Sequence, residues 1–216
     1  MQDHIILTGI ILKQSPVGEY DKRVILLTRE RGKITAFARG ARRPGNKLSA
    51  ATDPFAFGHF KLYEGKNTYT LTEADIQNYF EELRTDYIGA CYGMYFSEVA
   101  DYYARENNDE YEMMKLLYVA LRALCATALP KELVRYVYEC KTLAINGEFP
   151  GVPTDRKLEE STIYALNYIA ASPTEKLYTF KVSESVLEEL RQVSSDYMNK
   201  LVNHEFKSLE VLQTLC

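Results

Sequence analysis

The sequence predicts an α+β fold, in which an N-terminal five-stranded β barrel precedes an all-α helical domain. Alternating apolar runs fill the first 78 residues, whereas apolar residues recur at helical spacing from Phe80 onward. The charge changes at the same place, because residues 1–78 carry a net charge of +4 and residues 79–216 a net charge of −8. We therefore expect two domains, 1–78 and 79–216.

Five short apolar runs predict the barrel strands. They are His4–Lys13, Arg23–Thr28, Lys33–Ala38, Phe57–Tyr63 and Tyr69–Asp75. Gly9 indicates a bulge or a point of close approach, and turns are expected at Gln14–Asp21, at Glu30–Lys33 and at Glu64–Asn67. Leu48–Ala51 suggests one helical turn. This count fits a five-stranded Greek-key barrel of the OB type, and an SH3-like barrel has a similar signature.

The helical domain is predicted from apolar stripes. The stripe of the first helix is Leu83, Tyr87, Cys91 and Met94; that of the second is Met113, Leu116, Leu117, Ala120, Leu121 and Leu124; that of the third is Leu133, Val137, Cys140 and Ala144. Asp109 and Glu112 stand at capping-box spacing before the second helix. Pro130 starts the third helix and Asn146-Gly147 ends it.

A break follows at 146–154, and three more helices are expected at about 155–171, 183–203 and 205–215. The inner stripe of the helix at 183–203 is predicted to be Leu187, Leu190, Val193, Tyr197 and Leu201.

The residue patterns argue against an enzyme. Residues 40–47 resemble a phosphate-binding loop, but Asn46 stands where the lysine is required and Pro44 lacks an amide donor. The three histidines are isolated, no metal-ligand spacing occurs, and the paired glutamates lie in helical patterns, where adjacent residues point apart. We expect no catalytic residues, no metal and no cofactor.

The cellular setting is predicted from the cysteines and from the apolar runs. Cys91, Cys125, Cys140 and Cys216 form no CxxC pair, which is typical of reduced thiols in a cytosolic protein. The N-terminal apolar run is short and lacks a basic leader, so it indicates a strand and not a signal peptide. No run reaches membrane-spanning length, and no membrane partner is expected.

The segment Lys22–Lys47 is strongly basic, with nine Lys/Arg against the single acid Glu30. A basic hairpin followed by a basic loop suits a polyphosphate backbone, and strand aromatics offer base stacking. We expect Phe37, Phe57 and Phe60 in the barrel core, whereas Tyr63 and Tyr69 are as consistent with stacking as with the core. The predicted DNA-binding residues are Lys22, Arg23, Lys33, Arg39, Arg42, Arg43, Lys47, Tyr63 and Tyr69.

Four pieces of the chain together resemble the N-terminal domain of the RecO family of DNA repair and recombination mediators. They are the turn Gly18–Lys22, the turn Gly32-Lys33, the loop Arg39–Pro44 and the strand Leu71–Ala74. The similarity runs from Thr8 through the helical region and, more weakly, to Phe206–Leu209.

The resemblance implies an OB barrel with a helical domain and a non-enzymatic role. Family members bind single- and double-stranded DNA, anneal complementary strands and load the recombinase onto DNA coated by single-strand-binding protein. The implied partners are RecR and the acidic, hydrophobic tail of single-strand-binding protein, and the implied location is the cytoplasm, with the nucleoid. The family's DNA contacts carry over to Lys22, Lys33, Arg39, Arg42 and Arg43.

The chain departs from the family pattern at one place. Many relatives have a four-cysteine zinc module where this chain has Asn146–Thr154, which contains no cysteine. Four thiolates are needed to close such a site, so we predict no zinc and a shortened connection. Two other functions remain open: RNA binding or annealing on the same barrel, and an adaptor whose basic loop binds an acidic protein.

Overall fold

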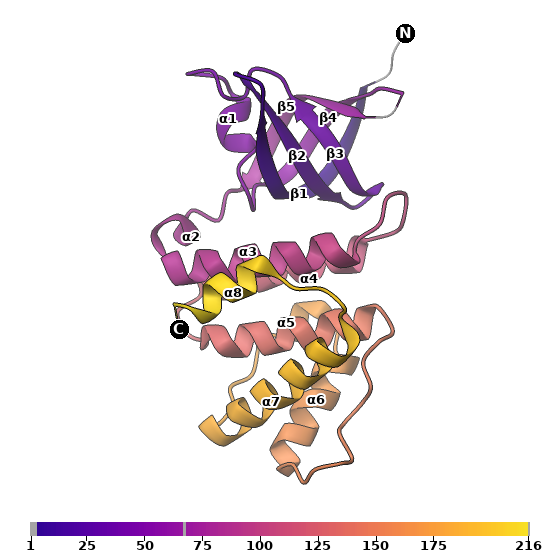
Figure 1. The fold of residues 1–216 in the computed structure, drawn as a ribbon, viewed down its shortest axis with the longest axis vertical. Helices are drawn as coiled ribbons and strands as arrows, with labels where there is room; N and C mark the ends of the chain where they lie inside the picture. The colour runs from indigo at the N-terminus through magenta and orange to yellow at the C-terminus, as the bar shows by residue number, and fades with distance from the viewer. Residues whose placement is uncertain (1–3, 67, 216) are drawn as a thin grey trace.

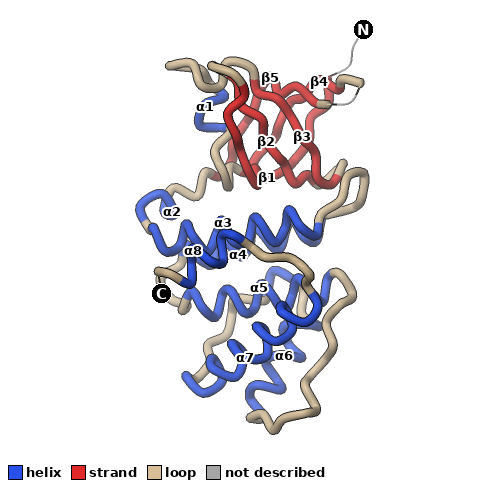
Figure 2. Tube along the Cα trace, viewed as in Figure 1, coloured by secondary structure: helices blue, strands red, loops and turns tan. Residues whose placement is uncertain are grey.

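The computed structural model describes residues 4–66 and 68–215, and shows a β barrel at one end of an elongated molecule with layers of helices below it (Figures 1 and 2). The strands are β1 (His4–Val17), β2 (Asp21–Thr28), β3 (Gly32–Ala38), β4 (Phe57–Glu64) and β5 (Tyr69–Asn78). They close in the order β1-β2-β3-β5-β4, with β3 and β5 parallel. This confirms the predicted five-stranded OB-type barrel.

The strand boundaries differ from the prediction mainly at β1. The expected turn Gln14–Asp21 was too long, because β1 continues to Val17 and pairs with β2 up to Asp21. Gly9 is confirmed as a point of close approach, since a Cβ there would lie 2.7 Å from the Leu27 carbonyl oxygen. The bulge lies instead between Ile11 and Lys13. Of the expected turn at 64–67, Asn67 lies outside the described residues.

The helices confirm the predicted all-α C-terminal part. They are α1 (Leu48–Ala51), α2 (Glu82–Thr85), α3 (Tyr87–Tyr103), α4 (Tyr111–Cys125), α5 (Lys131–Ile145), α6 (Glu160–Ala171), the 3-10 turn η1 (Thr174–Lys176), α7 (Glu184–Leu201) and α8 (Lys207–Gln213). Within the described ranges no helix is both long and apolar enough to cross a membrane.

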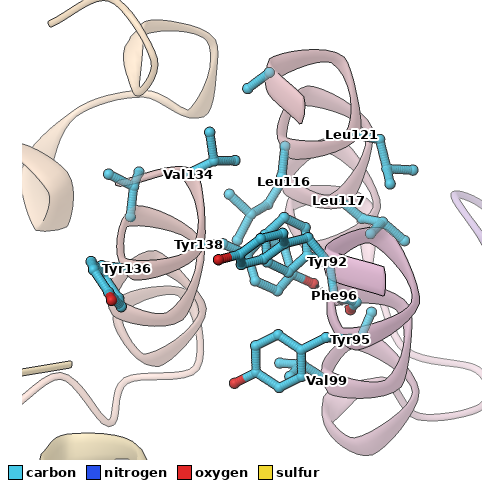
Figure 3. Packing of buried hydrophobic residues seen from close by; sticks show 14 of the residues in the cluster. Tyr92, Tyr95, Phe96, Val99, Leu116, Leu117, Leu121, Val134, Tyr136 and Tyr138 are labelled. Carbon is cyan, nitrogen blue, oxygen red and sulfur yellow. Dashed lines mark hydrogen bonds between the residues drawn. The ribbon is translucent and has the colours of Figure 1, made fainter. Parts of the chain in front are cut away.

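The predicted stripe of the first helix is only partly correct. Leu83 is buried but lies on α2, and Cys91 is partly buried, whereas Tyr87 is 65% exposed and Met94 is also exposed. Tyr92, Tyr95 and Phe96 of α3 point towards α5, where Phe96 stacks on Tyr138 with 4.3 Å between ring centroids (Figure 3). Buried aromatic rings contribute a large apolar area, so these rings determine which face of α3 is turned inward.

The α4 stripe is confirmed, because all six of its predicted residues are buried, but the capping box before it is not. Asp109 accepts a hydrogen bond from the Tyr111 amide, and Glu112 lies 3.7 Å from Lys115 instead of reaching back. Glu110 occupies the N-cap position without a side-chain cap. The spacing of Asp109 and Glu112 is that of a capping box, but the two side chains interact with other partners.

The α5 and α7 stripes are confirmed in their centres. Leu133, Val137 and Cys140 of α5 and Leu190 and Val193 of α7 are buried. Helix α6 begins at Glu160 and not near 155, because the preceding residues form an irregular segment.

The barrel and the helices share one hydrophobic cluster. Ile10, Leu12 and Leu27 belong to the same buried cluster as α3 and α4. Phe57 is half-buried and lies outside the barrel, with its ring centroid 4.6 Å from that of Tyr118, so only Phe60 of the three predicted core phenylalanines is fully buried. Side chains alternate between the two faces of a strand, so the side chains at outward-facing positions of β3 and β4 do not enter the barrel core.

The tip of the β2–β3 hairpin rests on the loop after α3. The amide of Lys33 donates to the Arg105 carbonyl at 3.0 Å, and the Asn107 amide donates to the Arg31 carbonyl at 3.0 Å. Gly32 has a φ of 64°, and a Cβ there would lie 2.2 Å from the Arg105 carbonyl oxygen. Only glycine satisfies both conditions, so this residue sets how the hairpin meets the helices.

Candidate nucleic-acid interface

The loop between β3 and α1, residues 39–47, leaves the barrel at the opposite end of the hairpin from the helical contact. Lys22 and Ala38 pair at this end, and Figure 1 shows α1 beside the barrel. We call residues 39–47 the basic loop. It contains Arg39, Arg42, Arg43 and Lys47.

Hydrogen bonds fix the basic loop to the β1–β2 turn. The Arg42 amide donates to the Tyr20 carbonyl at 2.8 Å, and one guanidinium nitrogen of Arg42 donates to the Gly18 carbonyl at 3.1 Å. The Gly40 amide donates to the Asp21 carboxylate at 2.7 Å. These bonds connect the basic loop to the β1–β2 turn, so the backbone that carries the cations and the Arg42 guanidinium are held in place.

Five cations of the predicted set are exposed around this loop. They are Arg23, Arg39, Arg42, Arg43 and Lys47. Among the residues that the structure describes, none of the five forms an ion pair with a carboxylate. Uncompensated like charges held close together repel one another, and a bound polyanion relieves that repulsion. We call these five residues the cationic surface.

Lys22 and Lys33 do not belong to the cationic surface. Lys22 is 8% exposed, and its ammonium donates to the Asp53 carboxylate at 3.1 Å and to the Ser49 carbonyl at 3.0 Å. The Lys33 ammonium lies 3.0 Å from the Asp101 carboxylate. Both ammonium groups therefore hold parts of the fold together, and we leave them out of the proposed phosphate-binding surface.

The two candidate stacking tyrosines are half-buried. Tyr69 packs against the barrel core, and its hydroxyl donates to the Glu64 carboxylate at 3.3 Å. The Tyr63 ring contacts the His4 ring edge-on, with 6.1 Å between centroids. Neither residue is part of the basic loop. A groove of about 760 Å³ runs instead between the basic loop and β5, where Arg39 and Lys47 face Thr70 and Thr72.

An exposed aromatic residue of this region was not predicted. Tyr20 lies in the β1–β2 turn, is 41% exposed and has the Arg43 guanidinium 4.8 Å from its ring centroid. The Gly18–Lys22 turn did stand out in the sequence, but the contact with Arg43 depends on how the two loops fold together.

The residues at the zinc-module position do not fit a zinc site. The segment 146–154 offers one carboxylate, Glu148, which already accepts a hydrogen bond from the Tyr103 hydroxyl at 2.7 Å. Cys140 of α5 is fully buried, and burial raises its pKa to about 12, which disfavours the thiolate that zinc requires. In the described part of the chain no three His, Cys, Asp or Glu side chains gather as metal ligands.

Comparisons with known protein families show which family the chain belongs to. The model of the recombination protein O N-terminal domain matches residues 1–80, and that of the recombination protein O C-terminal domain matches residues 84–153. The chain belongs to the RecO family. The first match ends just after β5, and the second covers α3, α4 and α5, so both structural parts are those of the family.

Several relatives of this RecO family member are named DNA repair protein RecO. That of Acetivibrio thermocellus is 29% identical over 246 residues, covering 99% of this chain and 98% of the relative. That of Clostridium perfringens is 27% identical, covering 95% and 96%. That of Symbiobacterium thermophilum is 33% identical over 144 residues, covering 67% and 57%. The similarity to the first two spans nearly the whole length of both chains.

Proposed function

We propose that this protein is a non-enzymatic DNA-binding recombination mediator in DNA repair. It binds single- and double-stranded DNA, promotes annealing and helps load the recombinase onto DNA coated by single-strand-binding protein. The observation that carries the proposal is the cationic surface, five exposed cations without carboxylate partners among the described residues of a RecO family chain. Phosphate binding by such a surface releases counterions from DNA and is independent of base sequence.

The proposed mechanism of annealing is electrostatic. Two complementary strands repel each other through their phosphates, and a surface that neutralises phosphates on both lowers this repulsion. Four of the five cations lie on the basic loop, which is hydrogen-bonded to the β1–β2 turn, and Arg23 lies on β2 next to that turn, so we expect them to provide this neutralisation without a large conformational change. No bond is made or broken, and the protein contributes only proximity and charge.

Charge reversal in the groove tests the proposal. The variant Arg39→Glu/Lys47→Glu should bind DNA of any sequence more weakly and should anneal complementary oligonucleotides more slowly. Lys157→Glu/Lys200→Glu is the matched control, because both lysines are exposed in the helical part and make no ion pair within it. Fluorescence anisotropy and a fluorescence-quenching annealing assay measure the two effects. If both variants anneal complementary strands at the same rate, the cationic surface is not responsible for annealing.

We extend the proposal to two protein partners, RecR and the tail of single-strand-binding protein. A groove of about 720 Å³ between α6 and the segment before α7 is lined by Tyr164, Tyr168 and Phe180. Lys181 is its only cation and Glu160 its only acid. An apolar wall beside an ammonium suits a short peptide with apolar side chains and a carboxylate, which is the chemistry of that tail.

The partner proposals have separate tests. A labelled tail peptide should bind the protein, and Lys181→Glu should weaken this binding while leaving DNA binding unchanged. A peptide without its acidic residues is the control. RecR association is measured by size-exclusion chromatography with light scattering, and the expected result is a complex that elutes earlier than either protein. The proposed location is the cytoplasm, at the nucleoid, which localisation of a fluorescent fusion would test.

A further inference from the structure

The structure provides an aromatic ring within the cationic surface that is suited to an unpaired base. The Tyr20 ring is 41% exposed at the tip of the β1–β2 turn, and the Arg43 guanidinium lies 4.8 Å from its centroid. Tyr20 is not among the residues of either core cluster that the structure describes. An exposed aromatic side chain among phosphate-binding cations is the arrangement by which proteins hold single-stranded nucleic acid.

We propose that Tyr20 is a stacking site for an unpaired nucleobase, and that it gives the protein a preference for single-stranded over double-stranded DNA. This inference rests on the proposed DNA-binding function and goes beyond it, because it names the residue that detects unpaired bases. The nine cations of Lys22–Lys47 do not make this distinction, since phosphates are present in both forms of DNA.

Hydrogen bonds hold the backbone that carries the ring. The Tyr20 carbonyl accepts a hydrogen bond from the Arg42 amide at 2.8 Å, and the neighbouring Asp21 carboxylate accepts one from the Gly40 amide at 2.7 Å. These bonds join the turn to the basic loop, and the Arg43 guanidinium packs against the ring itself. A turn that is already ordered loses less conformational freedom when a base stacks on its side chain, which favours binding.

Arg43 and Glu19 define how a strand approaches the ring. The five N–H donors of a guanidinium lie in its plane, so Arg43 resting on the ring still offers donors to a phosphate. The Tyr20 hydroxyl is hydrogen-bonded to the Glu19 carboxylate, which raises the pKa of the tyrosine. Because the carboxylate repels phosphates, we expect the backbone to pass on the Arg43 side and the base to reach the exposed part of the ring.

Tyr20 is better placed for stacking than the other tyrosines near the barrel. Tyr63 and Tyr69 are half-buried and contact His4 and the barrel core. Tyr87 is 65% exposed, but it lies on α3 in the helical part. Tyr20 therefore combines exposure with the cations, and Tyr87 provides a matched control.

The test compares three DNA ligands: a single-stranded oligonucleotide, the same oligonucleotide with abasic sites, and a duplex. Tyr20→Leu keeps the backbone hydrogen bonds of the turn and removes the ring. It should weaken binding to the intact single strand by roughly five- to hundredfold, the range of base stacking on an aromatic side chain, and leave binding to the abasic strand and the duplex unchanged. Tyr20→Phe and Tyr87→Leu should bind all three ligands like the unmodified protein.

The outcomes separate this inference from the proposed function. If Tyr20→Leu binds the intact single strand normally, or loses affinity equally for all three ligands, the stacking site is refuted while DNA binding stands. If the unmodified protein shows no saturable binding to any of the three, the proposed function fails and the stacking site fails with it. Fluorescence anisotropy at constant salt gives all the affinities.

Discussion

Neutralising two arginines of the basic loop should change the salt dependence of DNA binding by a definite amount. The logarithm of the affinity for single strands falls with the logarithm of salt concentration with a slope of about −0.7 for each neutralised phosphate. If each of the five cations of the cationic surface contacts one phosphate, the slope is about −3.5. Arg42→Gln/Arg43→Gln removes two contacts and should reduce it to about −2.1.

The difference is large enough to measure. Between 50 and 200 mM salt the affinity of the unmodified protein should fall roughly 100-fold, and that of the double variant only roughly 20-fold. The assay is fluorescence anisotropy with a labelled oligonucleotide at four or more salt concentrations. Glutamine is used in place of glutamate so that contacts are lost without new repulsion.

The control and the refuting result are equally specific. Lys157→Gln/Lys200→Gln removes the same number of charges from exposed positions of the helical part and should keep the steeper slope. Thermal melting checks that the variants fold, because the Arg42 side chain also donates to the Gly18 carbonyl. An unchanged slope for Arg42→Gln/Arg43→Gln in a folded variant would show that the basic loop does not contact phosphates.

Three further predictions concern stability. Glu139 is fully buried and accepts hydrogen bonds from Tyr95, Arg135 and Ser194. Glu139→Gln should therefore lower the free energy of unfolding, measured by urea titration, by about 3–5 kcal/mol. The control Glu205→Gln, at an exposed position, should leave this free energy unchanged. Gly32→Ala should destabilise the protein by about 1–3 kcal/mol or more because of its positive φ and the Arg105 carbonyl; unchanged melting would contradict this. Burial raises the pKa of Cys140 to about 12 in the folded protein. As the pH rises above about 9, the thiol therefore ionises in the unfolded chain first, and the free energy of unfolding should fall between about pH 9 and pH 12. In Cys140→Ala this free energy should fall less steeply with pH.

The sequence was sufficient for the fold because its signals are local. Alternation identified all five strands, and the spacing of Leu116, Leu117 and Leu121 identified the buried face of α4. The α3 face was missed because apolar and aromatic residues surround that helix, and only the contact between Phe96 and Tyr138 decides which ones are buried.

The candidate site was predicted less completely, because charge alone does not show where an ammonium points. Strand alternation places Lys22 on the inner face, two residues from Val24, and at that end of the barrel it reaches Asp53 after α1. Arg23, the next residue, points outward and stays exposed. Lys33 is paired with Asp101, which is distant in sequence. Contacts between distant segments therefore separate the structural cations from the surface cations, and the charge of Lys22–Lys47 alone does not reveal these contacts.

The distribution of charge suits the two proposed binding sites to different ligands. The barrel lies at one end of the molecule, and α6 and α7 lie at the other (Figure 1). The groove beside Lys181 is lined by residues of α6 and of the segment before α7, and the helical part to which it belongs, residues 79–216, has a net charge of −8. If the proposed function is correct, this excess of acids repels DNA held by the barrel and keeps it out of the helical groove. We therefore expect a strand and a partner peptide to bind at the same time, which is what acting on DNA that another protein already covers would require.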